Sequence, residues 1–363
     1  MNKYINIAGI KIALDTSDPV CNLIFRKFSN LEIFDDAEVD LFLKIDKNSD
    51  LNRYEPKVFS AKSSMNFNES TYLVDYNDRF TYTVSGLFLK STRINVNYSK
   101  GLKKHLKYII IDQYEAIVND ILSYKLFWYV IHVKLLQKNK SFIHACSFNI
   151  ENNNIIISGT GGCGKTSALF EFMQESKKFS YYGEDFTIID AEGFNHFSPK
   201  DVSIYQSDIN FGNHILAAIK NKFSLKRKFE WIIKSSLGIN PLIKVNPKDL
   251  NCHNGLTKSK NNFFFYLIRI KTNKIYHETQ DEHTVLKRVL YSSLRELKTL
   301  NEILALIQAN NTNYNFIDFD QVKKNTSQVC KSFIEKTRSN VIYADTSHKP
   351  QDIYKYIIKI LNE

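Results

Sequence analysis

The chain has 363 residues, of which 43% are hydrophobic and 24% are charged, and this composition is typical of a soluble globular protein. Its formal net charge of +11 is spread along the whole sequence, so it does not single out a nucleic-acid partner, and an anionic substrate fits it equally well. The five cysteines are widely separated and include no CxxC pair, which argues against a disulfide framework and a zinc site and favours a reducing, cytoplasmic location.

Residues 1–100 predict a β-rich N-terminal region. Short runs such as YINIAGIKIAL, TYLVDY and FTYTVSGLFLK are rich in β-forming residues and are separated by Asn, Asp, Gly and Ser turns. We expect no helix of any length in this region, and the sequence leaves its role open.

A helical pattern follows from about residue 106 to residue 137. Apolar residues recur there at three- and four-residue intervals, which predicts one long helix or two shorter ones. The most apolar part, YKLFWYVIHVKLL, is too short to cross a bilayer, so we expect no membrane span.

Beyond this point strand and helix patterns alternate, which predicts an α/β domain over residues 101–363 with a mixed sheet flanked by helices. The segment FSYYGEDFTIID predicts two strands joined by a turn with two carboxylates, and residues 219–238 have a basic, helical pattern. We further expect strands at SFIHACSFNI, NIIISG, NFFFYLIRI, YNFIDF and NVIYAD, and helices at 165–175, 284–308, 321–335 and 351–362.

The stretch NNNIIISGTGGCGKTSALFEF contains the pattern GxxxxGK[ST] between a predicted strand and a predicted helix. Small residues let consecutive backbone N–H groups point inward around an anion, and the N-terminus of the following helix adds further donors. In such a loop the lysine, here Lys165, reaches the β- and γ-phosphates, and the hydroxyl of Thr166 can bind Mg²⁺. We therefore predict a nucleotide-binding loop made of Gly159, Thr160, Gly161, Gly162, Cys163, Gly164, Lys165, Thr166 and Ser167.

Glu184 and Asp185 follow this loop by about twenty residues. Two adjacent carboxylates usually form an ordinary solvated turn. Phosphoryl transfer, however, needs a carboxylate near the phosphates to organise Mg²⁺ or the attacking group, and these two residues end a predicted strand next to the loop. Their position favours a functional role.

Taken together, the segments FIHACSFNIENNNIIISGTGGCGKTSALFEF and FSYYGEDFTIID resemble the catalytic domain of HPr kinase/phosphorylase and its shorter relatives. The resemblance extends from about residue 142 to the C-terminus and implies a phosphoenolpyruvate carboxykinase-like core. On this match His144 occupies the family's histidine position, Lys165 and Thr166 are the lysine and metal-binding hydroxyl of the loop, and Asp185 is the second of two aspartates.

Two departures from the family are visible. Glu184 stands where the first aspartate would be, and this leaves open which of the two carboxylates acts as the base. The glycine- and glutamate-rich signature of HPr kinases is not evident further along the chain. Its absence argues against HPr itself as the substrate and points to a divergent member of the family.

The resemblance implies a kinase that uses ATP and Mg²⁺ to phosphorylate a hydroxyl, most plausibly a serine of a protein or peptide. In this scheme Thr166, Asp185 and Glu184 hold Mg²⁺, and His144 helps to arrange the acceptor. Two alternatives stay open: a non-catalytic or regulatory ATP-binding protein, and a small-molecule kinase acting on a sugar. The identity of the acceptor, GTP or pyrophosphate as the donor, and assembly into a homo-oligomer also stay open.

Overall fold

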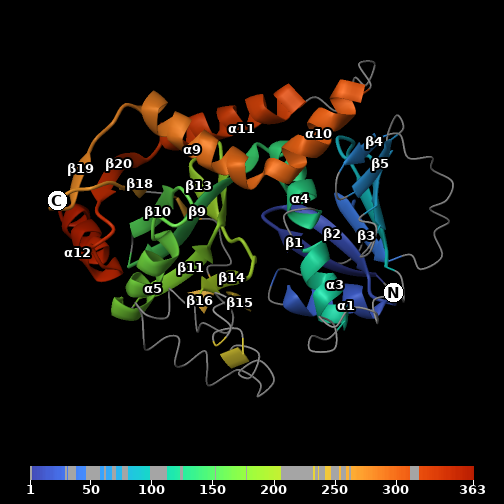
Figure 1. Cartoon of the computed structure of the whole chain (residues 1–363), viewed down its shortest axis with the longest axis horizontal. Coiled ribbons are helices and arrows are strands. Elements are labelled where there is room, and N and C mark those ends of the chain that lie inside the picture. The colour runs from blue at the N-terminus through green and yellow to red at the C-terminus, as the bar shows by residue number, and fades with distance from the viewer. Residues whose placement is uncertain are drawn as a thin grey trace. The chain divides into compact units, whose positions relative to one another are not determined.

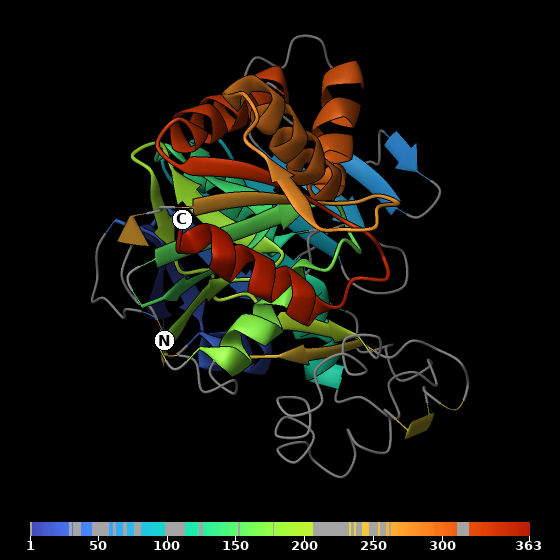
Figure 2. The same ribbon diagram turned by 90° about the vertical axis from the view of Figure 1, so that its left-hand side faces the viewer.

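The computed structural model shows a mixed α/β protein with mixed sheets, and eight helices lie in the described part of the chain (Figures 1 and 2). The predicted mixture of helices and mixed sheets is therefore confirmed. The structure describes residues 2–28, 31, 38–45, 58–60, 63–67, 71–75, 81–98, 113–122, 126–151, 153–176, 178–205, 232–233, 236, 242–246, 253–254, 259–260, 263–310 and 319–363.

These residues form two compact units. The first comprises Met1–Lys138 and Glu296–Asn325, and the second comprises Asn139–Arg295 and Thr326–Glu363. The predicted boundary near residue 100, between a β-rich region and a catalytic domain, stays a prediction.

The first unit is built on an eight-stranded sheet with the order β1-β2-β3-β8-β7-β6-β5-β4. Strand β3 runs parallel to both of its neighbours, whereas the other pairs are antiparallel. The strands are β1 (Asn2–Ile7), β2 (Ile10–Asp15), β3 (Leu41–Ile45), β4 (Val58–Ser60), β5 (Ser63–Phe67), β6 (Thr71–Asp75), β7 (Thr81–Ser85) and β8 (Thr92–Asn97).

A helix within the first hundred residues corrects the expectation that this region contains none. Helix α1 (Pro19–Lys27) begins after Asp18, whose side chain accepts a hydrogen bond from the amide of Val20 at 2.8 Å. Proline at the first helical position and an aspartate cap are strong signals for a helix start. The expectation failed because only nine residues separate the cap from the end of the helix, too few for a clear period.

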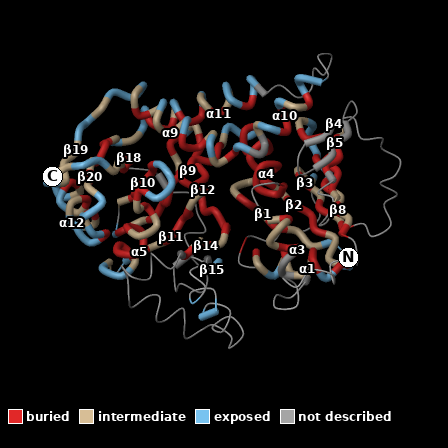
Figure 3. The backbone as a smooth tube through the Cα atoms, in the orientation of Figure 1, coloured by how far each residue is buried: buried red, intermediate tan, exposed pale blue. Residues whose placement is uncertain are grey.

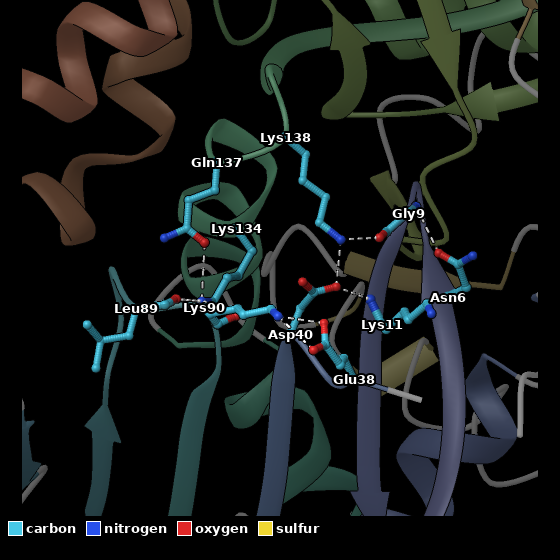
Figure 4. A network of polar contacts seen from close by, with 10 residues as sticks. All are labelled: Asn6, Gly9, Lys11, Glu38, Asp40, Leu89, Lys90, Lys134, Gln137 and Lys138. Atoms are coloured by element: carbon cyan, nitrogen blue, oxygen red, sulfur yellow. Dashed lines mark hydrogen bonds and ion pairs between the residues drawn. The ribbon is translucent and has the colours of Figure 1, made fainter. Parts of the chain in front are cut away.

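The pattern at 106–137 contains two helices, α3 (Gln113–Ile121) and α4 (Phe127–Leu136), and every residue of α4 is buried (Figure 3). One of these residues is Lys134, whose ammonium group donates to the backbone carbonyls of Leu89 and Lys90 and to Oε1 of Gln137 (Figure 4). Burial lowers the pKa of Lys134 to about 8, because taking the charge out of water disfavours it.

The second unit contains a ten-stranded sheet whose main path is β17-β13-β12-β9-β10-β18-β20-β19, with β11 and β16 branching from β9. Strands β10, β18 and β20 are parallel to one another. The strands are β9 (Lys140–Ile150), β10 (Asn153–Gly159), β11 (Phe179–Gly183), β12 (Phe186–Asp190), β13 (Phe194–His196), β16 (His253–Asn254), β17 (Ser259–Lys260), β18 (Phe263–Arg269), β19 (Tyr276–Glu278) and β20 (Arg338–Ala344), and β14 (Val202–Tyr205) pairs with β15 (Leu242–Val245) in a separate sheet.

Helices cover both faces of this sheet (Figure 2). On one face, Phe172 of α5 (Lys165–Glu175) packs on Phe148 of β9 and on Tyr354 of α12 (Pro350–Leu361). On the other face, α9 (Glu282–Glu296) and α11 (Phe319–Ile334) bury apolar residues against β9, β10, β18 and β20. The sheet is therefore the centre of three layers, and its exposed ends are the places where polar side chains can meet.

The helix expected over 284–308 is in fact two helices, α9 and α10 (Lys298–Asn310), which meet at the buried Leu297. No glycine or proline marks the break, so the periodic pattern concealed it. The basic stretch at 219–238 and the strand expected at YNFIDF lie almost entirely outside the described residues. Within the described part of the chain, each helix is too short or too polar to span a bilayer.

Candidate functional site

The predicted site residues lie at one edge of the ten-stranded sheet. Strand β9 lies between β10 and β11 and is antiparallel to both, so the carboxyl ends of β10 and β11 reach the same edge. The first half of β9 pairs with β12 and its second half pairs with β11, and the carboxylate turn lies between these two strands. Across β9, Ala145 pairs with Ser158 and His144 with Phe186. The glycine loop, His144 and the carboxylate turn are therefore neighbours.

The glycine loop joins β10 to α5, as the sequence predicts. Gly164 stands at the N-cap of α5 with a φ of 98°, a left-handed conformation that suits glycine. The buried Lys165 turns back over the loop, and its Nζ donates to the carbonyl oxygens of Gly159 at 3.1 Å and Thr160 at 3.2 Å. Its ammonium group thus lies within the curve of the loop, where an anion held by the loop would meet it.

Arg269, which the sequence alone does not single out, anchors this loop from the neighbouring strand. It ends β18, and its Nε donates to the carbonyl of Cys163 at 2.8 Å, while Nη1 donates to the carbonyl of Asp345. A Cβ atom on Gly164 would lie only 2.8 Å from its Nη2. Arg269 therefore packs directly on the loop backbone and brings a positive charge beside it.

The carboxylate turn has an unusual backbone. The amide of Phe186 donates to the carbonyl of Glu184 at 2.7 Å, and the residue between them, Asp185, has a φ of 61°. A hydrogen bond across three residues with a positive φ at the centre forms a tight γ-turn, which is rare and strained for a residue other than glycine. Such strain persists only where the surroundings enforce it, and it is concentrated at functional sites.

The two carboxylates of this turn have different partners. Oε1 of Glu184 accepts a hydrogen bond from the hydroxyl of Thr166 at 2.8 Å, which joins the turn directly to the glycine loop. Burial, followed by repulsion from Asp185, raises the pKa of Glu184 to about 8. Asp185 is more exposed and forms an ion pair with Lys200 at 2.7 Å. Burial therefore favours the protonated form of Glu184 in the ligand-free chain, whereas the Lys200 ammonium beside Asp185 favours its carboxylate.

Lys200 belongs to a short segment that passes over the carboxylate turn. The amide of Ser198 donates to the carbonyl of Tyr182 at 2.7 Å, and the amide of Ser203 donates to Oε2 of Glu184 at 3.4 Å. The Lys200 ammonium also lies 5.3 Å from the centre of the Phe186 ring. The segment from Ser198 to Ser203 thus contacts the turn at three points, and its lysine adds a third cation to the site.

His144 is held by its backbone as well as by its strand. Its amide donates to Oγ of Ser293 at 3.1 Å, and its carbonyl accepts from Oγ of Ser158 at 2.8 Å. Side chains two residues apart on a strand point to the same face, and Cys146 contacts the carbonyl of Lys165 through its Sγ. The His144 side chain therefore faces the layer that contains the glycine loop and α5.

The remaining predicted residues lie where a loop would need them. Thr160, Gly161 and Gly162 form its exposed tip, Cys163 is buried beneath it, and Ser167 follows in the first turn of α5. Burial strongly raises the pKa of the nearby Cys146, so that thiol stays protonated. The loop thus offers backbone amides, one lysine and three hydroxyls to a ligand.

The oxygen donors of this site suit Mg²⁺. They are the Thr166 hydroxyl and the adjacent carboxyls of Glu184 and Asp185, and hard oxygen ligands are those that Mg²⁺ prefers. Among the described residues, no group of three or more His, Cys, Asp and Glu side chains is arranged to hold a metal ion by itself.

Comparison with known proteins adds no assignment, because no protein-family model matches the chain and no curated protein is significantly similar to it.

Proposed function

We propose that the protein is an ATP- and Mg²⁺-dependent kinase, related to HPr kinases, that transfers the γ-phosphoryl group to a hydroxyl of a protein or peptide. The observation that carries the proposal is the hydrogen bond of 2.8 Å between Thr166, in the first turn after the glycine loop, and Glu184. A hydroxyl and a carboxyl that meet beside an anion-binding loop are the pair that holds Mg²⁺ against the phosphates of a nucleotide.

Within this proposal the two carboxylates have separate tasks. Glu184 is buried and bonded to Thr166, so it belongs to the metal and nucleotide side of the site. Asp185 is more exposed and has an ammonium partner in Lys200, which keeps it as a carboxylate. We therefore assign Asp185 as the base that takes the proton of the acceptor hydroxyl.

The other groups act by position and charge. Lys165 exchanges its two loop carbonyls for phosphate oxygens when a nucleotide enters, which costs little because both sets of acceptors lie inside the loop. Lys200 holds Asp185 in place and lies where a third cation can offset charge on the transferred group. His144 faces the same layer and orients the acceptor. When bound, Mg²⁺ would neutralise charge that develops on the phosphates.

The test is transfer of labelled γ-phosphate from ATP to lysate proteins or synthetic serine peptides, followed by identification of the labelled product. Lys165→Ala should abolish transfer and the rise in melting temperature that ATP produces. Lys178→Ala removes an exposed lysine of the same unit and serves as the matched control. Equal stabilisation of the Lys165→Ala variant and the wild type by ATP would contradict the assignment of the loop.

The rival proposal is a protein that binds ATP as a structural or regulatory ligand. It predicts tight ATP binding without label in any product and without release of phosphate. Fast release of phosphate without an acceptor would instead indicate an ATPase. A third result, label on a sugar but on no protein, would indicate a small-molecule kinase with the same catalytic groups.

A further inference from the structure

Arg269 connects the glycine loop to a second segment at the same edge of the sheet, residues 345–349. We propose that this segment is a binding subsite for the nucleoside part of the nucleotide, that is, its ribose and base. The proposal rests on the proposed function, since it concerns the direction in which a nucleotide lies in that site.

The order of the strands in the sheet indicates the direction in which a bound nucleotide would lie. Strands β10, β18 and β20 are parallel, so the glycine loop after β10, Arg269 at the end of β18 and Asp345 just after β20 follow one another along one edge. The carboxylate turn lies on the opposite side of the loop, beyond β9. If the γ-phosphate points to Glu184 and Asp185, the other end of the nucleotide must point to residues 345–349.

The distance between the glycine loop and residues 345–349 matches the length of a nucleoside. Neighbouring strands are roughly 5 Å apart, so the segment after β20 lies on the order of 10 Å from the loop after β10. An extended nucleoside attached to a phosphate held in the loop covers such a span. Arg269 lies between the two and donates to both, to the carbonyl of Cys163 at 2.8 Å and to the carbonyl of His348 at 3.3 Å.

Hydrogen bonds within the segment, and one to Thr272, hold residues 345–349 in place. Oδ1 of Asp345 accepts from the amide of Ser347 at 2.9 Å, and Oδ2 accepts from the amide of Thr272 at 3.3 Å. The amide of Asp345 donates to Nδ1 of His348 at 2.9 Å. A fixed segment loses little conformational freedom when it binds a ligand.

The hydrogen bond from the amide of Asp345 to Nδ1 determines which hydrogen-bonding group His348 presents to a ligand. Because Nδ1 accepts a hydrogen bond from the amide of Asp345, the neutral imidazole has its own proton on Nε2. The ring is half-buried, so part of its surface is accessible. His348 therefore presents a hydrogen-bond donor and a flat aromatic face, which match the oxygen acceptors of ribose and the plane of a nucleobase.

The experiment compares two ligands that share phosphates but differ in the nucleoside, ATP and inorganic tripolyphosphate, each titrated by calorimetry with Mg²⁺. The variant is His348→Asn, because the Asn side-chain oxygen can still accept from the amide of Asp345. We expect ATP to bind about tenfold more weakly and tripolyphosphate to bind as to the wild type. Lys165→Ala should weaken both ligands.

His277→Ala provides the matched control, because this half-buried histidine of β19 bonds to Tyr356 through Nδ1 at 2.9 Å but lies on a different strand. It should change neither affinity. If His348→Asn leaves ATP binding unchanged, or weakens both ligands equally, the subsite is wrong although the kinase proposal stands. If neither ligand binds to the wild type, the kinase proposal fails, and the subsite fails with it.

Photolabelling gives an answer that does not depend on any substitution. Light-activated 8-azido-ATP should attach to a peptide that contains residues 345–349, and excess tripolyphosphate should suppress the label by occupying the loop. Label on the peptide that contains Glu184 to Lys200 would place the nucleobase beside the carboxylate turn, at the other end of the site, and overturn the proposal.

Discussion

Three glycines of the loop differ in what a methyl group would meet, and they allow its geometry to be tested one factor at a time. At Gly161 an added methyl group would have no other atom within 4 Å, and the backbone has no left-handed φ. Gly162 has a φ of 78° in open space. Gly164 has a φ of 98°, and a methyl group there would also lie 2.8 Å from Nη2 of Arg269. Alanine therefore adds no strain at Gly161, backbone strain at Gly162, and both backbone strain and a steric clash at Gly164.

The magnitudes follow from these environments. Alanine in the left-handed region costs about 1–2 kcal/mol, which corresponds to about a five- to thirtyfold loss of the binding-competent loop in Gly162→Ala. In Gly164→Ala the methyl group must also push the Arg269 guanidinium aside, and we expect this to weaken its bond to the carbonyl of Cys163, which adds at most about 1.5–3 kcal/mol, the value of a hydrogen bond from a charged donor. We expect Gly161→Ala to bind nucleotide as the wild type does.

The assay is titration of each variant with ATP and Mg²⁺, together with a thermal melt that shows whether the fold is intact. The affinities should fall in the order Gly161→Ala, Gly162→Ala, Gly164→Ala. Combining Gly164→Ala with Arg269→Ala should cost less than the sum of the two single losses, because both substitutions weaken the same bond between Arg269 and Cys163. If Gly161→Ala is as harmful as Gly164→Ala, or if no variant affects ATP binding, the loop does not bind nucleotide in the way inferred.

Asp185→Asn should lower the rate of phosphoryl transfer by about 10²–10⁴-fold with little change in ATP affinity, whereas Glu192→Gln, in an exposed turn of the same unit, should change neither. His144→Ala should reduce transfer to the acceptor about tenfold or more and leave ATP binding nearly intact, as measured by labelled product and by calorimetry. Burial lowers the pKa of Lys134 to about 8 in the folded chain, from its ordinary value of 10.5 in the unfolded chain. The resulting destabilisation is complete only well below pH 8 and disappears as the pH rises towards 10.5. The free energy of unfolding of the wild type relative to Lys134→Met should therefore rise by about 1.4 kcal/mol between pH 7 and pH 9 in urea titrations followed by tryptophan fluorescence, and parallel pH profiles would contradict it.

The parts of the site that are local in sequence were predictable. The glycine pattern between an apolar strand and a helical run predicts β10, the loop and α5, because each glycine serves a backbone conformation set by its neighbours. The same is true of the carboxylate turn, which interrupts two β-forming runs. Conversely, the short α1 and the break at Leu297 have no periodic signal long enough to be read.

Arg269 and Lys200 could not be predicted in the same way, because long-range pairing brings them to the site. Arg269 contacts Cys163 only because β18 lies parallel to β10, and Lys200 reaches Asp185 only after the hairpin of β12 and β13 returns the chain. The sequence did contain a weak signal for the arginine. It is the one charge in the apolar run NFFFYLIRI, and a charge at the end of a buried strand needs partners there.

At the strained turn, the two adjacent carboxylates have different partners: Glu184 bonds to Thr166, and Asp185 pairs with Lys200. With Asp185 in the left-handed region, the turn interrupts the pairing with β9 but keeps the direction of the chain, because β11 and β12 both run antiparallel to β9. Oε1 of Glu184 accepts from the hydroxyl of Thr166 at 2.8 Å, and glutamate has one methylene more than aspartate with which to reach it. The departure from the paired aspartates of HPr kinases is therefore compatible with the same chemistry. In the proposed kinase Asp185, at the turn, would supply the base, and its longer neighbour Glu184 would supply the metal ligand.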